Sequence, residues 1–306
     1  MSTAAPNRKR SFYKVSGGGN DFIAFPDGTG AAAPTSPVPT AEQIRAWCRR
    51  GLSLGADGIF VLRPGTSSVV MEHFNADGSA SDLCLNGTRC AARLAFELGW
   101  AEERVVIVTG AGQVVARDAG RAGIELELPL PKEAPREIIA TVQTGEHAAL
   151  EISGTLLTVG VPHLILDQPK GLAAATVESL GKALVHHPAV GPAGANIDFV
   201  HWPTPDRLEI RTYERGVYGE TLACGTGVMA AVAARLHARR ARLPQCQLPV
   251  TALTRGGFEL RVAGEEDPAA SPFPLKSWSL TGDARLVARG ELLPGALALP
   301  DEPVWS

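Results

Sequence analysis

The 306-residue chain lacks the features that mark membrane, secreted and nucleic-acid-binding proteins. No apolar stretch reaches the roughly 20 residues that a helix needs to cross a bilayer. Met1–Ser11 is polar, without the apolar segment of a secretory signal. The nearest candidate for a basic patch, Arg235–Arg242, is expected at a helix end, where cations favour the helix dipole. With a net charge of -3, we expect no nucleic-acid partner and no membrane.

Cysteine is scarce, and its spacing is not that of a metal site. The five cysteines are an odd number in a long chain, which argues against a disulfide framework and for reduced thiols in the cytoplasm. No two of them form a Cys-x-x-Cys pair, so we expect no metal. Gly17–Gly19 is not a phosphate-binding loop, because no Gly-Lys-Ser/Thr follows it.

Short β-branched runs alternate with a few helical segments, which predicts an α+β fold. Strands are expected at Phe12–Val15, Gly58–Arg63, Val69–Phe74, Arg104–Thr109, Gly123–Leu128, Leu156–Val161, Ile197–His201, Arg207–Tyr213, Phe258–Val262 and Trp278–Leu280. Helices are expected at Ala41–Arg50, Asn86–Leu98, Val177–His186 and Thr226–Arg240, the first after a Thr40/Gln43 capping box.

The best linker candidate is Pro129–Pro131, between two strand-rich halves. It divides the chain into an N-terminal lobe, 1–130, which carries Cys84, and a C-terminal lobe, 131–285, which carries Cys224. The remaining tail, 286–306, is a candidate strand that returns to the N-terminal lobe.

A weak internal repeat is the most informative feature of the sequence. Cys84 and Cys224 are each followed, three residues later, by a glycine, Gly87 and Gly227, and then by an Ala-rich helix. Both helices are apolar on nearly all sides, so each belongs inside a set of strands rather than on a surface. Two similar halves could bring the two cysteines face to face.

A cysteine at a helix N-terminus has a specific chemistry. The first N–H groups of a helix have no internal acceptor and carry partial positive charge. They lower the pKa of a thiol placed there, and they bind carboxylates. We therefore expect a base and a carboxylate anchor at each helix start. The other cysteines, Cys48, Cys90 and Cys246, are expected to be core residues, as most free cysteines are.

Eight stretches, in order along about Phe12–Leu286, resemble the diaminopimelate epimerase family of pyridoxal-independent amino-acid epimerases. They are Gly17–Phe22, Gly55–Gly58, Phe74–Ser79, Cys84–Cys90, Gly160–His163, Ala195–Phe199, Tyr213–Gly216 and Glu220–Gly227. The resemblance implies two pseudo-symmetric lobes, each a curved, mostly antiparallel and barrel-like sheet around a central buried helix. It places the active site in the cleft between the lobes and implies a homodimer without a cofactor. The implied reaction converts LL-2,6-diaminopimelate to meso-diaminopimelate in lysine and cell-wall precursor synthesis.

Residue by residue, the resemblance makes Cys84 and Cys224 the catalytic pair, with one thiol on each face of the α-carbon. His163 and Glu214 match positions that tune the cysteines and order the site. Substrate-binding positions match Asn20, Asn75, Leu85, Asn86, Asn196, Glu214, Arg215, Gly225 and Thr226, with backbone groups of Leu85, Asn86, Gly225 and Thr226 as the carboxylate cradle. The chain departs from the family at Leu85, where Gly is usual, and at Val161, where Asn is frequent. Both changes bear on which amino acid is bound.

Three other functions remain open at this point. A thiol hydrolase with Cys224 as nucleophile and His163 as base would leave Cys84 unused and the repeat unexplained. A non-catalytic small-molecule-binding protein would not need both cysteines. A related racemase could act on another amino acid, such as histidine. His163 taken alone could also be a satisfied core histidine.

Overall fold

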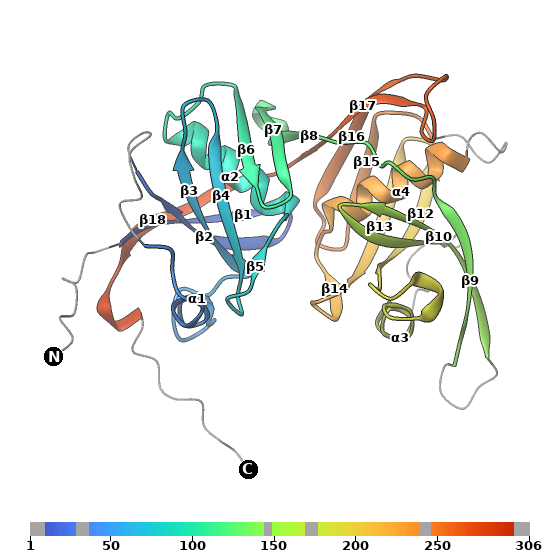
Figure 1. Ribbon diagram of the computed structural model, residues 1–306, viewed down its shortest axis with the longest axis horizontal. Coiled ribbons are helices and arrows are strands. Elements are labelled where there is room, and N and C mark those ends of the chain that lie inside the picture. The colour runs from blue at the N-terminus through green and yellow to red at the C-terminus, as the bar shows by residue number, and fades with distance from the viewer. Residues whose placement is uncertain (1–9, 29–36, 144–148, 169–176, 239–245, 297–306) are drawn as a thin grey trace, which may run out of the picture. The chain divides into compact units, whose positions relative to one another are not determined.

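The computed structural model describes residues 10–28, 37–143, 149–168, 177–238 and 246–296 (Figure 1). The chain forms two compact units: unit 1 comprises Met1–Asp118 and Ala284–Ser306, and unit 2 comprises Ala119–Asp283. Pro129–Pro131 therefore lies within unit 2, and the chain passes between the units at Asp118–Ala119 and at Asp283–Ala284. Within the described ranges, no helix has the length and apolarity needed to cross a membrane.

In unit 1, a mixed and mostly antiparallel sheet runs in the order β18-β1-β2-β3-β4-β6-β7. The pairs β2–β3 and β4–β6 are parallel, and a short strand, β5, pairs with β4. The elements are β1 (Arg10–Gly17), β2 (Asn20–Pro26), α1 (Ala41–Cys48), β3 (Gly58–Pro64), β4 (Val69–Asn75), β5 (Ala80–Ser81), α2 (Leu85–Glu97), β6 (Arg104–Thr109), β7 (Gly112–Asp118) and β18 (Arg285–Leu292).

In unit 2, the corresponding order is β9-β10-β11-β12-β13-β15-β16-β17-β8, with β14 beside β13. The elements are β8 (Ile124–Leu128), β9 (Arg136–Val142), β10 (Leu150–Val159), β11 (Val161–Asp167), α3 (Val177–Leu184), β12 (Asn196–Thr204), β13 (Arg207–Glu214), β14 (Gly219–Thr221), α4 (Gly225–Ala238), β15 (Val250–Thr254), β16 (Glu259–Glu266) and β17 (Leu275–Gly282).

The two units repeat one topology. The pairings among β1 to β7 match those among β10 to β16, strand for strand and in direction. In each unit the central helix, α2 or α4, follows the equivalent short strand, β5 or β14. The register also corresponds. In unit 1, Phe22 faces Gly58, Phe60 faces His73 and His73 faces Ser81; in unit 2, His163 faces Asn196, Asp198 faces Thr212 and Thr212 faces Thr221. Cys84 and Cys224 each follow three residues after the last of these positions.

A buried helix lies at the centre of each unit. In unit 1, α2 packs against β1, β2, β6 and β18; in unit 2, α4 packs against β10, β11, β12 and β16 (Figure 1). Ten residues of α2 and ten of α4 are buried, on all sides of each helix, as the apolar sequence predicts. The sheets curve around the helices, and among the described strands β7 is not paired with β18, so the sheet of unit 1 does not close into a barrel. The predicted α+β fold class is confirmed.

Some element boundaries differ from those expected. Leu156–Val161 was expected as one strand, but Gly160 has φ +70° and turns the chain, so β10 ends at Val159 and β11 begins at Val161. The first helix has the expected capping box: Thr40 Oγ1 accepts from the Gln43 amide, and Gln43 Oε1 accepts from the Thr40 amide. That helix ends at Cys48 and α3 at Leu184, two residues before the expected ends.

The glycine three residues after each cysteine allows the helix start to pack closely. A Cβ on Gly227 would lie 2.3 Å from Asp198 Oδ1, nearer than atoms can approach. A Cβ on Gly87 would lie 3.3 Å from the terminal methyl of Met71, a flexible side chain. Only Gly227 is therefore required by the packing around it.

We expect Gly227→Ala to lower the free energy of unfolding by about 1–3 kcal/mol, the usual cost of overpacking a core. Gly87→Ala is the matched control at the equivalent position, and its loss should stay below about 1 kcal/mol, since Met71 can move and alanine favours a helix. Urea unfolding of the two variants and the parent gives the comparison. Equal losses would contradict this reading of the packing.

An aromatic cluster fills the part of unit 1 that corresponds to the polar positions of unit 2. The rings of Phe60 and His73 lie 5.7 Å and 5.6 Å from the ring of Phe22. His73 is 8% exposed, and neither of its ring nitrogens has a hydrogen-bond partner in the described part of the chain. Burial disfavours the imidazolium and lowers the pKa of His73 to about 4.

This burial makes the fold sensitive to acid. Because the pKa of His73 is lower in the folded than in the unfolded chain, its full contribution to stability is present above about pH 6.5. It is lost as the pH falls towards 4, by at most about 3 kcal/mol. We expect His73→Phe to reduce the fall in unfolding free energy between pH 7 and pH 4.5, measured by urea unfolding. The exposed His186→Phe serves as control, and an equal effect of both changes would contradict the assignment.

Candidate active site

Cys84 lies immediately before the first turn of α2. Its backbone is extended, its carbonyl accepts the first helical hydrogen bond from Thr88 N at 2.8 Å, and its Sγ accepts from Gly87 N at 3.4 Å. The thiol is half-buried. The next residue, Leu85, is buried and begins the helix, so the leucine is accommodated without displacing the cysteine from the helix start.

A chain of amide contacts joins this helix start to the β1–β2 turn. Asn86 Nδ2 donates to Asn20 Oδ1 at 2.8 Å, and Asn86 Oδ1 accepts from Nη2 of the fully buried Arg89 at 2.6 Å. Gly18 lies in the turn with φ +59°, and a Cβ there would come within 2.7 Å of the Asn86 side chain. The glycine-rich turn thus delivers Asn20 to Asn86.

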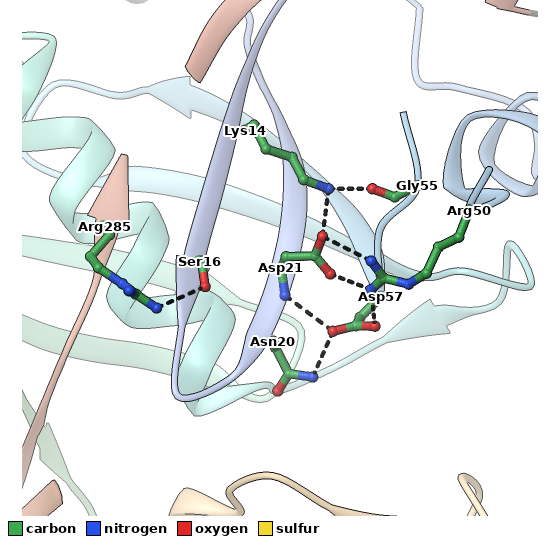
Figure 2. A network of polar contacts seen from close by, with 8 residues as sticks. All are labelled: Lys14, Ser16, Asn20, Asp21, Arg50, Gly55, Asp57 and Arg285. Atoms are coloured by element: carbon green, nitrogen blue, oxygen red, sulfur yellow. Dashed lines mark hydrogen bonds and ion pairs between the residues drawn. The ribbon is translucent and has the colours of Figure 1, made fainter. Parts of the chain in front are cut away.

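A cluster of ion pairs fixes the other side of Asn20 (Figure 2). Asn20 Nδ2 and the Asp21 amide both donate to Asp57 Oδ2 at 3.1 Å, and Arg50 pairs with Asp57 at 2.7 Å and with Asp21. Lys14 pairs with Asp21 at 2.6 Å. Burial opposes the ionisation of Asp21, but Arg50 and Lys14 outweigh it and lower its pKa. The cluster holds Asn20 in one orientation.

Asn75, the last predicted site residue of unit 1, ends β4. Its side chain donates to Ser79 Oγ at 3.0 Å and is exposed. Its hydrogen bond therefore lies within its own turn and does not extend to Asn20 or Asn86. The structure brings Asn20 into direct contact with Asn86, two residues after Cys84 in the first turn of α2, and places Asn75 at the end of the strand beside β3.

Cys224 holds the equivalent place before α4. Its carbonyl accepts from Val228 N at 3.1 Å, and the thiol is 8% exposed. Cys224 Sγ lies 3.3 Å from Thr226 Oγ1 and 4.0 Å from Asn196 Nδ2. The Gly225 and Thr226 backbone forms the first turn of the helix.

Behind Thr226 lies a buried polar chain. Thr226 Oγ1 is 3.0 Å from His163 Nε2, and His163 Nδ1 is 2.6 Å from Asp198 Oδ2. Thr212 Oγ1 donates to Asp198 Oδ1 at 2.7 Å. His163 and Asp198 are both fully buried. His163 is thus a buried histidine with both ring nitrogens hydrogen-bonded, and one of these bonds joins it to the Thr226 side chain that contacts Cys224.

Glu214 and Arg215 come from the end of β13. Glu214 Oε1 accepts from Thr221 Oγ1 at 2.6 Å. Burial raises the pKa of Glu214, against the opposing effects of the Thr221 hydroxyl and His163. The Arg215 amide donates to Asn196 Oδ1 at 2.9 Å, and its guanidinium donates to the Ala193 carbonyl.

The expected acidity of the Cys224 thiol is wrong. Burial raises the pKa of Cys224 well above its usual value, and the nearby carboxyl groups of Glu214 and Asp198 raise it further. The Thr226 hydroxyl and the Gly227 amide at the helix start lower it, as anticipated, but by less. A helix N-terminus does not by itself make a thiolate when two carboxyl groups lie beside a buried sulfur.

Hydrogen bonds thus join most of the predicted residues into one group in each unit, whereas the Asn75 side chain bonds within its own turn. Asp198, Thr212, Asp57 and Arg89 belong to these groups but were not predicted as site residues. Asp198 could have been identified, because residues two apart in a strand share a face and Asp198 follows Asn196 by two. Among the described residues, no group of His, Cys, Asp and Glu is arranged to hold a metal ion.

Known proteins resemble this chain in sequence over most of its length. The family described as diaminopimelate epimerase matches residues 12–124 and 155–271. Diaminopimelate epimerase from Gemmatimonas aurantiaca is 36% identical over 92% of this chain and 99% of its own length, and that from Aquifex aeolicus is 34% identical over 92% and 97%.

Solved structures share the fold at low identity. A hydroxyproline epimerase from Agrobacterium vitis superposes with a TM-score of 0.64 at 17% identity, covering 99% of this chain and 98% of its own. A PhzF-family phenazine biosynthesis protein from Bacillus anthracis gives a TM-score of 0.64 at 14% identity, covering 94% and 99%. The family match and the extent of the closer relatives lead to one conclusion: this chain belongs to the diaminopimelate epimerase family.

Proposed function

We propose that this protein epimerises LL-2,6-diaminopimelate to meso-diaminopimelate without a cofactor, using Cys84 and Cys224 as its two bases. The observation that carries the proposal is the equivalence of the two cysteines. Each lies before the first turn of a buried helix, at the same register of the repeated topology. Two matched thiols are what inversion by a two-base route needs, since the proton leaves one face of the α-carbon and returns to the other.

The proton transfer conserves charge at the site. One cysteine starts as thiolate and takes the α-proton, which forms an S–H bond and leaves a carbanion. The other starts as thiol and gives its proton to the opposite face, which leaves a thiolate there. The reaction requires one sulfur from each unit to reach the same α-carbon.

The carbanion is the costly species, because no cofactor serves as an electron sink. We assign its stabilisation to the helix starts, where the backbone amides of Leu85, Asn86, Gly225 and Thr226 would hold the α-carboxylate. Fixed donors of this kind interact more strongly with developing charge when water is excluded. The buried or half-buried state of these residues supports that role.

Recognition of the substrate falls to the polar side chains around the cysteines. We assign it to Asn20, Asn75, Asn196, Glu214 and Arg215, which can bind the amino and carboxyl groups of the second, unreactive centre. The ion-pair cluster behind Asn20 and the Arg215–Asn196 hydrogen bond preorganise two of them.

The alternatives are less well supported. A hydrolase would need His163 at the Cys224 thiol, but the Thr226 hydroxyl lies between them. A racemase for another amino acid, such as histidine, is not favoured, because relatives 32–37% identical to this chain carry the name diaminopimelate epimerase. Leu85 and Val161 remain the positions at which the substrate preference could differ.

Two further expectations belong to the proposal. We propose a cytoplasmic enzyme, since five cysteines, an odd number in a long chain, argue against a disulfide framework. We propose a homodimer on the strength of the family resemblance.

We expect Cys84→Ser and Cys224→Ser each to lower the epimerisation rate at least about 100-fold, because a positioned acid or base contributes this much or more. The assay follows conversion of LL-diaminopimelate in D₂O, with chiral chromatography for the product and NMR for deuterium at the α-carbon. Histidine is tested in parallel and should show no exchange.

The control is Cys48→Ser, since Cys48 is a core residue of unit 1 whose pKa burial raises to about 12. It should leave the rate within about twofold, because it contributes no acid or base. Near-normal epimerisation by either active-site variant would contradict the two-thiol mechanism. Exchange with histidine but not with diaminopimelate would contradict the proposed substrate.

A further inference from the structure

A continuous line of hydrogen bonds leads from the Cys224 thiol into the sheet of unit 2. It runs from Sγ to Thr226 Oγ1 at 3.3 Å, from there to His163 Nε2 at 3.0 Å, and from His163 Nδ1 to Asp198 Oδ2 at 2.6 Å. The residues come from α4, β11 and β12, three elements that pack together. The line ends at a fully buried carboxyl group.

The hydrogen bonds of the two Asp198 oxygens determine which group donates and which accepts along this line. Oδ1 accepts from the Thr212 hydroxyl, which leaves Oδ2 to accept from His163 Nδ1–H. A histidine that donates from Nδ1 has an acceptor at Nε2 when it is neutral. That acceptor faces the Thr226 hydroxyl, whose oxygen can in turn accept from the Cys224 thiol.

We propose that the Thr226 hydroxyl relays the proton between the Cys224 thiol and His163, and that Asp198 is the positioning residue that holds His163 to receive it. In this step the S–H bond breaks as a new O–H bond forms on Thr226, and the original Thr226 proton moves to Nε2. The products are a thiolate and an imidazolium, with Asp198 ionised throughout. The relay deepens the proposed function and rests on it for its role in turnover.

The relay explains how a buried thiol can ionise in an unfavourable place. Three titratable groups face or approach Cys224: His163 on β11, Asp198 on β12 and Glu214 on β13. Burial and the two carboxyl groups raise the pKa of Cys224 if its proton must leave for bulk water. Moving the proton by two hydrogen bonds instead leaves the net charge of the group unchanged, and the imidazolium forms beside an existing anion.

The repeat shows that the relay belongs to one half of the chain. The positions of His163, Asp198 and Thr212 correspond to Phe22, Phe60 and His73 in unit 1, and that of Thr226 corresponds to Asn86. The aromatic side chains cannot relay a proton, and the low pKa of His73 keeps its ring neutral. Cys84, which is half-buried, therefore serves as an internal reference for Cys224.

The test measures thiolate reactivity directly, without substrate. The full-length protein is treated with iodoacetamide at pH 8, and mass spectrometry gives the alkylation rate of the Cys224 peptide relative to the Cys84 peptide in the same sample. We expect Thr226→Val to lower this ratio about tenfold, because the thiol loses its proton acceptor, and Thr226→Ser to stay within about twofold of the parent.

Asp198→Asn distinguishes the relay most sharply from a purely electrostatic effect of Asp198 on Cys224. If Asp198 acted on Cys224 only through its charge, removing it would favour the thiolate and speed alkylation. The relay predicts the reverse, about a tenfold loss, because the imidazolium loses its counter-ion. Glu214→Gln should leave the ratio unchanged or raise it, whereas a decrease would make Glu214 the acceptor and overturn the proposal.

An unchanged ratio in Thr226→Val, or equal losses in Thr226→Val and Thr226→Ser, would also overturn the relay. If Asp198→Asn does not fold, the threonine pair still decides. If the parent protein fails to epimerise diaminopimelate while these ratios behave as expected, the proposed function fails and the relay stands.

Discussion

Each half of the molecule has to enclose one buried helix, and this constraint shapes both halves. Wrapping strands around α2 and α4 buries their flanks and leaves the first turn as the polar end of each helix. The cysteine, the glycine three residues on and the surrounding amides all belong to that first turn. The strands that enclose each helix therefore also determine which side chains lie against the cysteine thiol at its N-terminus.

The two halves use the same topology with different chemistry. In unit 1, an ion-pair cluster around Asp57 orients Asn20 from the protein surface, while Phe22 fills the interior. In unit 2, the interior holds the His163–Asp198 pair, fully buried and joined to the cysteine by Thr226. Duplication thus supplies two equivalent thiols, and the side chains behind them make the two thiols unequal.

The two buried helices and the repeated organisation could be predicted from the sequence, because Cys84 and Cys224 are each followed by a glycine at the same spacing and then by a helix. The boundary between β10 and β11 could not be predicted, because a single turn residue, Gly160, interrupts an otherwise continuous β-branched run. The acidity of Cys224 was predicted with the wrong sign. The helix dipole is readable from the sequence, whereas the burial of the sulfur and its proximity to Glu214 arise only when β13 pairs with its neighbours.

The central claim is that both sulfurs serve one α-carbon, and a crystal structure of the Cys84→Ser variant with bound diaminopimelate tests it most directly. We expect the hydroxyl oxygen that replaces the Cys84 sulfur and the Cys224 Sγ to lie on opposite faces of the same α-carbon, each within about 3.5 Å, the separation of groups poised to react. A complex in which the substrate contacts only one of the two positions, with the other turned away from it, would contradict the claim.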